Sequence, residues 1–270
     1  DVCGGSGHLT RILAGFSKDP TILADLYFAK AWLARRFMVP GCEPIICDAN
    51  APLPFARGVF TYAMCSDAFQ YVWTKRRFIA EMSRLVDLDR PGASGPGTVL
   101  INHTHNQITW SPSHGQPLPP SGYRDLFEAI EPRIFAEGGL FADVVGGRPL
   151  DLSRRDPEAV LDADPALTIV ATRDPGVFAP HAVPGPGRAQ GQYRINPLYT
   201  VVPDGQTLRL TLTFPDPDYA DEYGACLQYL PESTTIDAEA LAQVEASGEP
   251  GPLAELVRRK VIVDLPRHYY

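Results

Sequence analysis

The sequence predicts an α/β protein whose core is a doubly wound, mostly parallel sheet. Strand-like and helix-like segments alternate about every 20 residues through the first 110 residues. The strand-like segments are continuous apolar runs, which is typical of strands that helices cover on both faces. The second part of the chain, residues 111–270, holds 20 of the 27 prolines. We therefore expect a smaller α+β appendage, rich in turns, at the C-terminal end.

The elements up to residue 102 follow from spacing and from apolar runs. Helices are expected where apolar residues recur three or four positions apart, over residues 6–16, 27–37 and 74–87. Ser6 is placed as the cap of the first helix, and Phe28 and Trp32 are expected in the core. Strands are expected over the apolar runs 21–24, 44–47, 59–65 and 98–102, which are followed by Asp25, Asp48, Ser66-Asp67 and His103.

The later elements carry weaker patterns. They comprise a proline-rich loop at 111–120, a helix at 123–130, strands at 133–136 and 166–172, and an insertion at about 138–163 with a short helix near 157–161. A hairpin is expected around 203–205, and helices at 237–246 and 252–260 with a strand at 261–265 close the chain. Three parts result: a ligand-binding domain over 1–173, a Pro/Gly-rich linker over 174–192, and an α+β module over 193–270.

Composition and net charge disfavour two classes of binding partner, nucleic acids and membranes. The net charge is −8, from 32 acidic against 24 basic residues, which disfavours a nucleic-acid partner because phosphates need a basic face. No apolar run approaches the ~18 residues of a membrane span, so no membrane partner is expected. Five cysteines without a CxxC spacing predict buried, reduced thiols in a cytoplasmic protein. Composition does not predict the oligomeric state.

A glycine-rich turn leads into the first expected helix, in the sequence DVCGGSGHL over residues 1–9. Glycines let a ligand approach the backbone closely, and a helix N-terminus favours an anionic group. A dinucleotide fingerprint starting at Gly5 and Gly7 needs a third glycine, where this chain has Thr10. A P-loop would need a Gly-Lys-Ser/Thr sequence, which does not follow. Both of these phosphate-binding interpretations are therefore disfavoured.

The motif resembles that of the class I S-adenosylmethionine-dependent methyltransferases, of the small-molecule type, which have a Rossmann-like fold. Asp1 matches the acid of the family's first motif, and Gly5 and Gly7 match its second and third glycines, whereas Cys3 replaces the first. Asp25, 18 residues after Gly7 (25 − 7 = 18), matches the acid that closes the second strand. In this family a strand precedes the first motif, so the resemblance implies a chain that is truncated at its N-terminus.

The resemblance implies a set of residues that bind the cofactor, S-adenosyl-L-methionine. Asp25 would take both ribose hydroxyls, because two carboxylate oxygens suit a vicinal diol. Asp48 would accept the adenine amino group, with the backbone N–H of Ala49 facing a ring nitrogen. The complete implied set is Asp1, Gly5, Ser6, Gly7, Asp25, Leu26, Asp48, Ala49, Ser66 and Asp67.

The implied activity is methyl transfer to a small-molecule acceptor, through an oxygen, nitrogen or carbon nucleophile. A base is needed only where the nucleophile must lose a proton, and His103, followed by His105, is the leading candidate. The His103-x-His105 pair also suggests a metal, but spacing identifies no third ligand, so no metal is predicted. Two alternatives stay open: a non-catalytic methyltransferase-like binding or scaffold module, and an NAD-dependent oxidoreductase.

Overall fold

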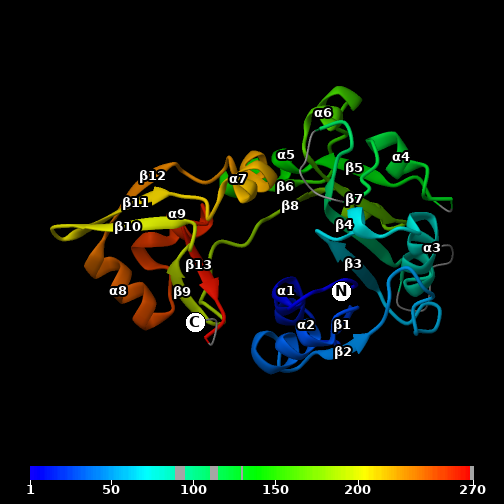
Figure 1. Cartoon of the computed structure of the whole chain (residues 1–270), viewed down its shortest axis with the longest axis horizontal. Coiled ribbons are helices and arrows are strands. Elements are labelled where there is room, and N and C mark those ends of the chain that lie inside the picture. The colour runs from blue at the N-terminus through cyan, green and yellow to red at the C-terminus, as the bar shows by residue number, and fades with distance from the viewer. Residues whose placement is uncertain (89–94, 110–114, 129, 268–270) are drawn as a thin grey trace. The chain divides into compact units, whose positions relative to one another are not determined.

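The computed structural model describes residues 1–88, 95–109, 115–128 and 130–267, and the chain divides into two compact units (Figure 1). The first comprises Asp1–Gly139 and Leu152–Ala179, and the second Leu140–Asp151 and Pro180–Tyr270. The domain boundaries expected from the sequence, at 173 and 193, differ from this division. Residues 140–151 belong to the second unit because β6 (Leu150–Asp151) pairs antiparallel with β8 (Pro180–His181).

The first unit is built on parallel strand pairs joined by the glycine-rich segment. Its strands are β1 (Ile22–Asp25), β2 (Glu43–Ile46), β3 (Tyr62–Ser66), β4 (Thr98–His105), β5 (Arg133–Ala136) and β7 (Ala166–Thr172). Strands β1 and β2 are parallel, as are β3 and β4, whereas β7 runs antiparallel to both β4 and β5. Val2 forms a parallel bridge to Ala24 of β1, and its N–H donates to the Met64 carbonyl of β3 at 2.8 Å. The order is therefore β2, β1, the Val2 segment, β3, β4, β7 and β5, a mixed sheet that is parallel up to β4.

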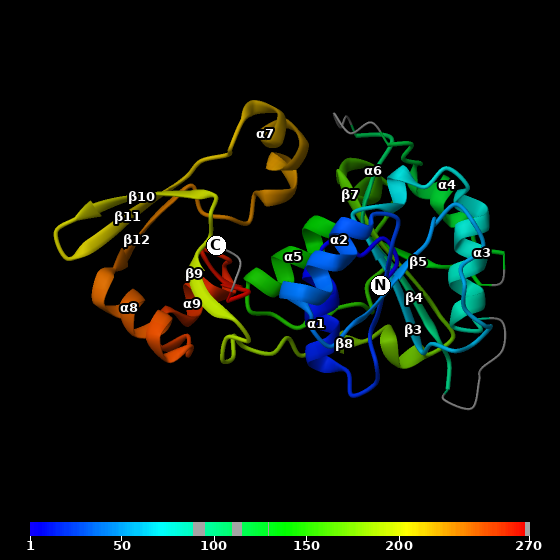
Figure 2. The same cartoon turned by 60° about the horizontal axis from the view of Figure 1, so that its bottom comes forward.

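Helices cover this sheet. They are α1 (His8–Phe16), α2 (Phe28–Leu33) continued by a π-helix (Ala34–Met38), α3 (Lys75–Leu85), α4 (Pro120–Arg124) and α6 (Glu158–Ala163), while α5 (Glu137–Val145) begins in the first unit. Figure 2 shows α3 on one side of the β3 and β4 ribbons and α1 with α2 on the other. The apolar face expected on α3 is confirmed, because Phe78, Ile79, Met82 and Leu85 are all buried in the main core.

Three local expectations are wrong. The N-cap of α1 is Gly7 at φ 85°, and Ser6 does not cap it. The side chains of Phe28 and Trp32 are 70% and 49% exposed. Helix α2 and the π-helix that continues it are buried instead through the small residues Ala31 and Ala34, and a Cβ on Gly7 would lie only 2.9 Å from the Cβ of Ala34. The expected helix at 123–130 is α4, which begins at Pro120 and ends at Arg124.

Among the described residues, the second unit contains three small antiparallel sheets, and it has a core of its own. Besides β6 and β8, its elements are β9 (Gln192–Ile195), β10 (Tyr199–Asp204), β11 (Thr207–Leu212), α7 (Pro217–Tyr223), β12 (Ser233–Asp237), α8 (Ala238–Ser247), α9 (Ala254–Arg258) and β13 (Ile262–Leu265). The expected hairpin is β10–β11, with Gly205 at φ 63° in its turn, and β12 adds a third strand to it. Strand β13 pairs with β9. Within the described ranges of both units, no helix has the length and apolar character that a membrane crossing requires.

Part of the proline-rich loop at 111–120 lies outside the described residues.

Candidate active site

The glycine loop lies at the carboxyl end of β1, between that strand and β3. Cys3, Gly5 and Gly7 all have positive φ values, of 60°, 55° and 85°. No atom lies within 4 Å of the position that a Cβ on Gly5 would occupy, whereas Gly7 is packed against Ala34, the first residue of the π-helix that follows α2. Gly5 thus presents bare backbone to open space, as the close approach of a ligand requires.

Asp25 holds this loop. It ends β1 and is 7% exposed, and its Oδ2 accepts a hydrogen bond from the N–H of Gly5 at 2.8 Å. Its Oδ1 accepts from the N–H of Tyr27, the N-cap residue of α2, also at 2.8 Å. Each carboxylate oxygen has a second lone pair, so Asp25 retains the capacity to accept from a vicinal diol. One residue therefore joins the glycine loop to the start of α2 and keeps the capacity to accept further hydrogen bonds.

Asp1 acts on the same loop from the other side. Its Oδ2 accepts a hydrogen bond from Oγ1 of Thr10 at 2.7 Å, and Thr10 is fully buried. Thr10 stands where a dinucleotide fingerprint has its third glycine. The Thr10 hydroxyl has its hydrogen-bond partner, Asp1, within the same segment, so the residue that departs from the dinucleotide fingerprint is a buried, hydrogen-bonded part of this loop.

The other expected cofactor residues lie at neighbouring strand ends. Asp48 follows β2 and is exposed, and its Oδ1 accepts from the backbone N–H and the Nδ2 of Asn50, at 2.8 and 3.0 Å. Ala49 is half-buried, and Leu26 is 54% exposed. Ser6 and Ser66 are half-buried. The structure joins Gly5 to Asp25 directly, while the part of Asp48 in binding adenine stays a prediction.

A second group of polar residues lies where β3 and β4 end. Asp67 follows β3 with φ 49°, and its N–H donates to the carbonyl of Asn102 at 3.0 Å. Strand β4 continues to His105, past the expected end, and a bulge between Ile101 and Thr104 interrupts its pairing with β7. His103 lies in this bulge with φ 48°. Left-handed backbone at two non-glycine residues is uncommon, and such residues and bulges occur often near functional sites.

His103 is paired with a carboxylate that the sequence analysis missed. Its Nδ1 lies 2.5 Å from Oε2 of Glu137, a buried residue at the start of α5. Burial alone would lower the pKa of His103, but the hydrogen bond with Glu137 and the negative charges of Glu137, Asp67 and Asp164 outweigh it and raise this pKa. Glu137 directly follows β5, so the rule that led to Asp25 would also have found it.

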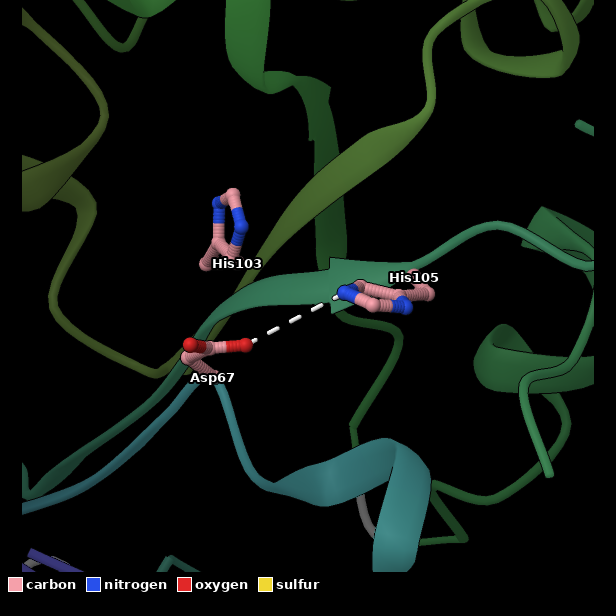
Figure 3. A group of neighbouring side chains, drawn as sticks. All are labelled: Asp67, His103 and His105. Carbon is pink, nitrogen blue, oxygen red and sulfur yellow. Dashed lines mark ion pairs between the residues drawn. The ribbon is translucent and has the colours of Figure 1, made fainter. Parts of the chain in front are cut away.

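His105 faces Asp67 (Figure 3). Its Nε2 lies 3.9 Å from Oδ1 of Asp67, and the same Oδ1 accepts from Nε2 of Gln70 at 3.1 Å. Behind the ring, the hydroxyl of Tyr123 donates to the carbonyl of His105 at 2.8 Å and accepts from Thr104 at 2.9 Å. Both histidines are thus held on a backbone that buried hydrogen bonds keep in place.

The chain resembles solved structures of S-adenosylmethionine-dependent methyltransferases. One similar chain comes from a Haloferax volcanii complex of the Trm112 methyltransferase activator with a protein assigned as a methyltransferase. It is 18% identical to this chain, with a TM-score of 0.47, over 67% of this chain and 81% of that one. Geranyl diphosphate C-methyltransferase from Streptomyces coelicolor is 16% identical, with a TM-score of 0.45, over 64% and 69%. The [4+2]-cyclase SpnF is 14% identical, with a TM-score of 0.44, over 64% and 73%.

These likenesses concern the fold. No protein-family model matches the chain, and no curated sequence does.

Proposed function

We propose that this protein is an S-adenosylmethionine-dependent methyltransferase that acts on a small molecule. The observation that supports this most strongly is the hydrogen bond from the Gly5 N–H to the buried Asp25 carboxylate. It brings an open glycine backbone and a buried carboxylate together at the carboxyl end of β1, and we propose that this carboxylate binds the diol. Ligands of α/β sheets bind at this edge, where neighbouring strands diverge.

The residues of the loop suit a nucleoside with a vicinal diol. Asp25 supplies the two acceptor oxygens, and Gly5 leaves the space that a ribose would fill. Bound S-adenosylmethionine would supply a methyl group on a positively charged sulfonium. Asp67, at the end of the neighbouring β3, adds a carboxylate on the side of the acceptor.

The acceptor is proposed to bind at the ends of β3 and β4. His103 and His105 act there on the nucleophilic atom, and hydrogen bonds to Glu137 and Tyr123 hold these two residues in position. Holding donor and acceptor in line is itself a large part of catalysis, worth ~7–11 kcal/mol for well-oriented partners. The protein therefore needs positioning groups more than a covalent nucleophile.

Calorimetry with S-adenosylhomocysteine tests the donor site. We expect binding to the full chain with a micromolar dissociation constant, and no binding of NADH in a fluorescence titration. Absence of S-adenosylhomocysteine binding by the folded protein would contradict the proposal. Binding without turnover over a broad set of acceptors would instead favour the non-catalytic module, and NADH binding would favour the oxidoreductase.

A further inference from the structure

The side chains of Asp67, His103 and His105 form a three-ligand group for a cation (Figure 3). One ligand atom from each lies within 4.8 Å of the other two, and no other such group of His, Cys, Asp or Glu occurs among the described residues. The sequence suggested only the two histidines. The parallel pairing of β3 with β4 brings the third ligand, Asp67, from 36 positions away (103 − 67 = 36).

Glu137 supports one of the ligands as a metal site requires. Its Oε2 is the hydrogen-bond partner of Nδ1 of His103, which leaves Nε2 as the nitrogen that would bind a cation. Oγ1 of Thr168 in turn donates to the other carboxylate oxygen of Glu137 at 3.3 Å. Histidines that bind metals commonly have a carboxylate on the opposite ring nitrogen, which sets the tautomer and the ring orientation.

Two residues near the group in the chain carry a buried acceptor atom with no hydrogen-bond partner in the part of the chain that the structure describes. Oε1 of Gln70, a fully buried residue, and Oδ1 of Asn102 have no hydrogen-bond partner among the described residues. Both are close to the group in the chain: Gln70 donates to Asp67, and Asn102 precedes His103. Buried acceptors without a donor need an explanation, and water held on a cation is a strong donor.

We propose that Asp67, His103 and His105 bind a divalent transition-metal cation of the Zn²⁺ type. Two imidazoles and one carboxylate match the preference of such ions, and three protein ligands leave a position open for water or substrate. The role of this open position rests on the proposed function. The open position takes a hydroxyl oxygen of the methyl acceptor, so the acceptor is a hydroxylated small molecule. The histidines then act on the acceptor through the cation.

The proposed transfer converts a hydroxyl group of the acceptor to a methyl ether. A cation held by these three residues would lower the pKa of the hydroxyl bound to it, and the hydroxyl proton would leave to solvent water. The resulting oxygen anion forms a bond to the methyl carbon while the bond from that carbon to sulfur breaks, and the electron pair stays on sulfur. The products are the methyl ether, neutral S-adenosylhomocysteine and one proton.

Titration of the metal-stripped full chain with Zn²⁺ by calorimetry, and with Co²⁺ by visible absorption, tests the site without any donor. We expect one ion per chain, and affinity at least tenfold weaker in Asp67→Asn and in His105→Gln. Glu137→Gln should weaken it by about 10–100-fold, the usual effect of a supporting carboxylate. His181→Gln, in the second unit, is the matched control and should bind as the wild type does.

No binding by the wild type overturns the proposal, and so does binding that Asp67→Asn and His105→Gln leave unchanged. The Asp67 side chain is 44% exposed, so Asp67→Asn should keep the thermal unfolding midpoint of the wild type. Binding of S-adenosylhomocysteine is measured separately in the same metal-stripped protein. A wild-type protein that binds S-adenosylhomocysteine but no cation rejects the cation site alone. A wild-type protein that binds the cation but no S-adenosylhomocysteine rejects the donor site alone.

Discussion

Nδ1 of His103 and Oε2 of Glu137 lie 2.5 Å apart, and this contact joins the bulge of β4 to the first residue of α5. The Glu137 side chain is 7% exposed and that of His103 18%, so water cannot replace either partner easily. The left-handed backbone at His103 directs its ring toward the carboxylate, and the pair therefore couples the shape of the bulge to the end of β5.

This pair should show a large coupling in a double-mutant cycle. His103→Ala leaves the Glu137 carboxylate buried without its partner, which should lower the free energy of unfolding by about 3 kcal/mol. Glu137→Ala should cost a similar amount. The double variant should be less destabilised than the sum, because the second change removes the stranded group. Urea unfolding of the four proteins measures this, and strict additivity would show that the contact contributes nothing to stability.

Two glycines of the loop should respond differently to alanine. Gly7→Ala combines a φ of 85° with a Cβ only 2.9 Å from that of Ala34, and we expect it to destabilise the fold by about 2–3 kcal/mol. Gly5→Ala meets only the backbone strain, about 1 kcal/mol, because no atom is near its Cβ.

Comparison of the Gly5→Ala and Gly7→Ala variants separates effects on stability from effects on ligand binding. Gly5→Ala fills the space proposed for the ribose, so it should weaken S-adenosylhomocysteine binding at least tenfold while thermal unfolding changes little. A Gly5→Ala protein that binds as the wild type does would place the nucleoside elsewhere.

Asp25→Asn tests the diol acceptor. The amide keeps one oxygen for a backbone N–H but loses the second acceptor and the charge, so we expect 10–100-fold weaker S-adenosylhomocysteine binding. Asp19→Asn, an exposed acid in the loop after α1, is the control and should leave the affinity unchanged. Equal effects of the two substitutions in calorimetry would count against a specific role for Asp25.

Glu81 should make stability depend on pH. Its carboxylate accepts from Nε and Nη2 of Arg84, both at 2.8 Å, and from the N–H of Leu53 at 2.7 Å. The hydrogen bond from Arg84 is the main cause that lowers the pKa of Glu81 below 4.5. A depressed carboxyl pKa stabilises the fold above the unfolded value, and this contribution disappears as pH falls through the folded value.

Glu81→Gln should accordingly lower the free energy of unfolding by about 2 kcal/mol at pH 7. The gap to the wild type should narrow as pH falls below 4.5, and it should close once the pH is below the folded pKa of Glu81, where both side chains are neutral. Glu43→Gln breaks an exposed pair with Arg35 at 3.6 Å and should change stability by less than about 0.5 kcal/mol. A gap for Glu81→Gln that stays constant in acid would show that the charge is not involved.

Much of the first unit was predictable, because buried parallel strands are apolar runs that sequence displays directly. Strands 133–136 and 166–172 have the predicted bounds, and the apolar face of α3 is buried as predicted. The exposure of Phe28 and Trp32 was not predictable. Helical spacing shows which side chains share a face, but the close approach of Gly7 to Ala34, at the start of the π-helix after α2, decided which face packs against the glycine loop.

The sequence by itself determined the candidate site residues: the glycine turn, and the polar residues that close apolar strands, since parallel strands bring their carboxyl ends to one edge. Only the tertiary structure decided which of these residues meet. Asp67 and His105 face each other because β3 pairs with β4, and His103 reaches Glu137 because a bulge turns its backbone left-handed. Strand pairing and bulges depend on packing between segments far apart in the chain, and no local pattern of residues encodes them.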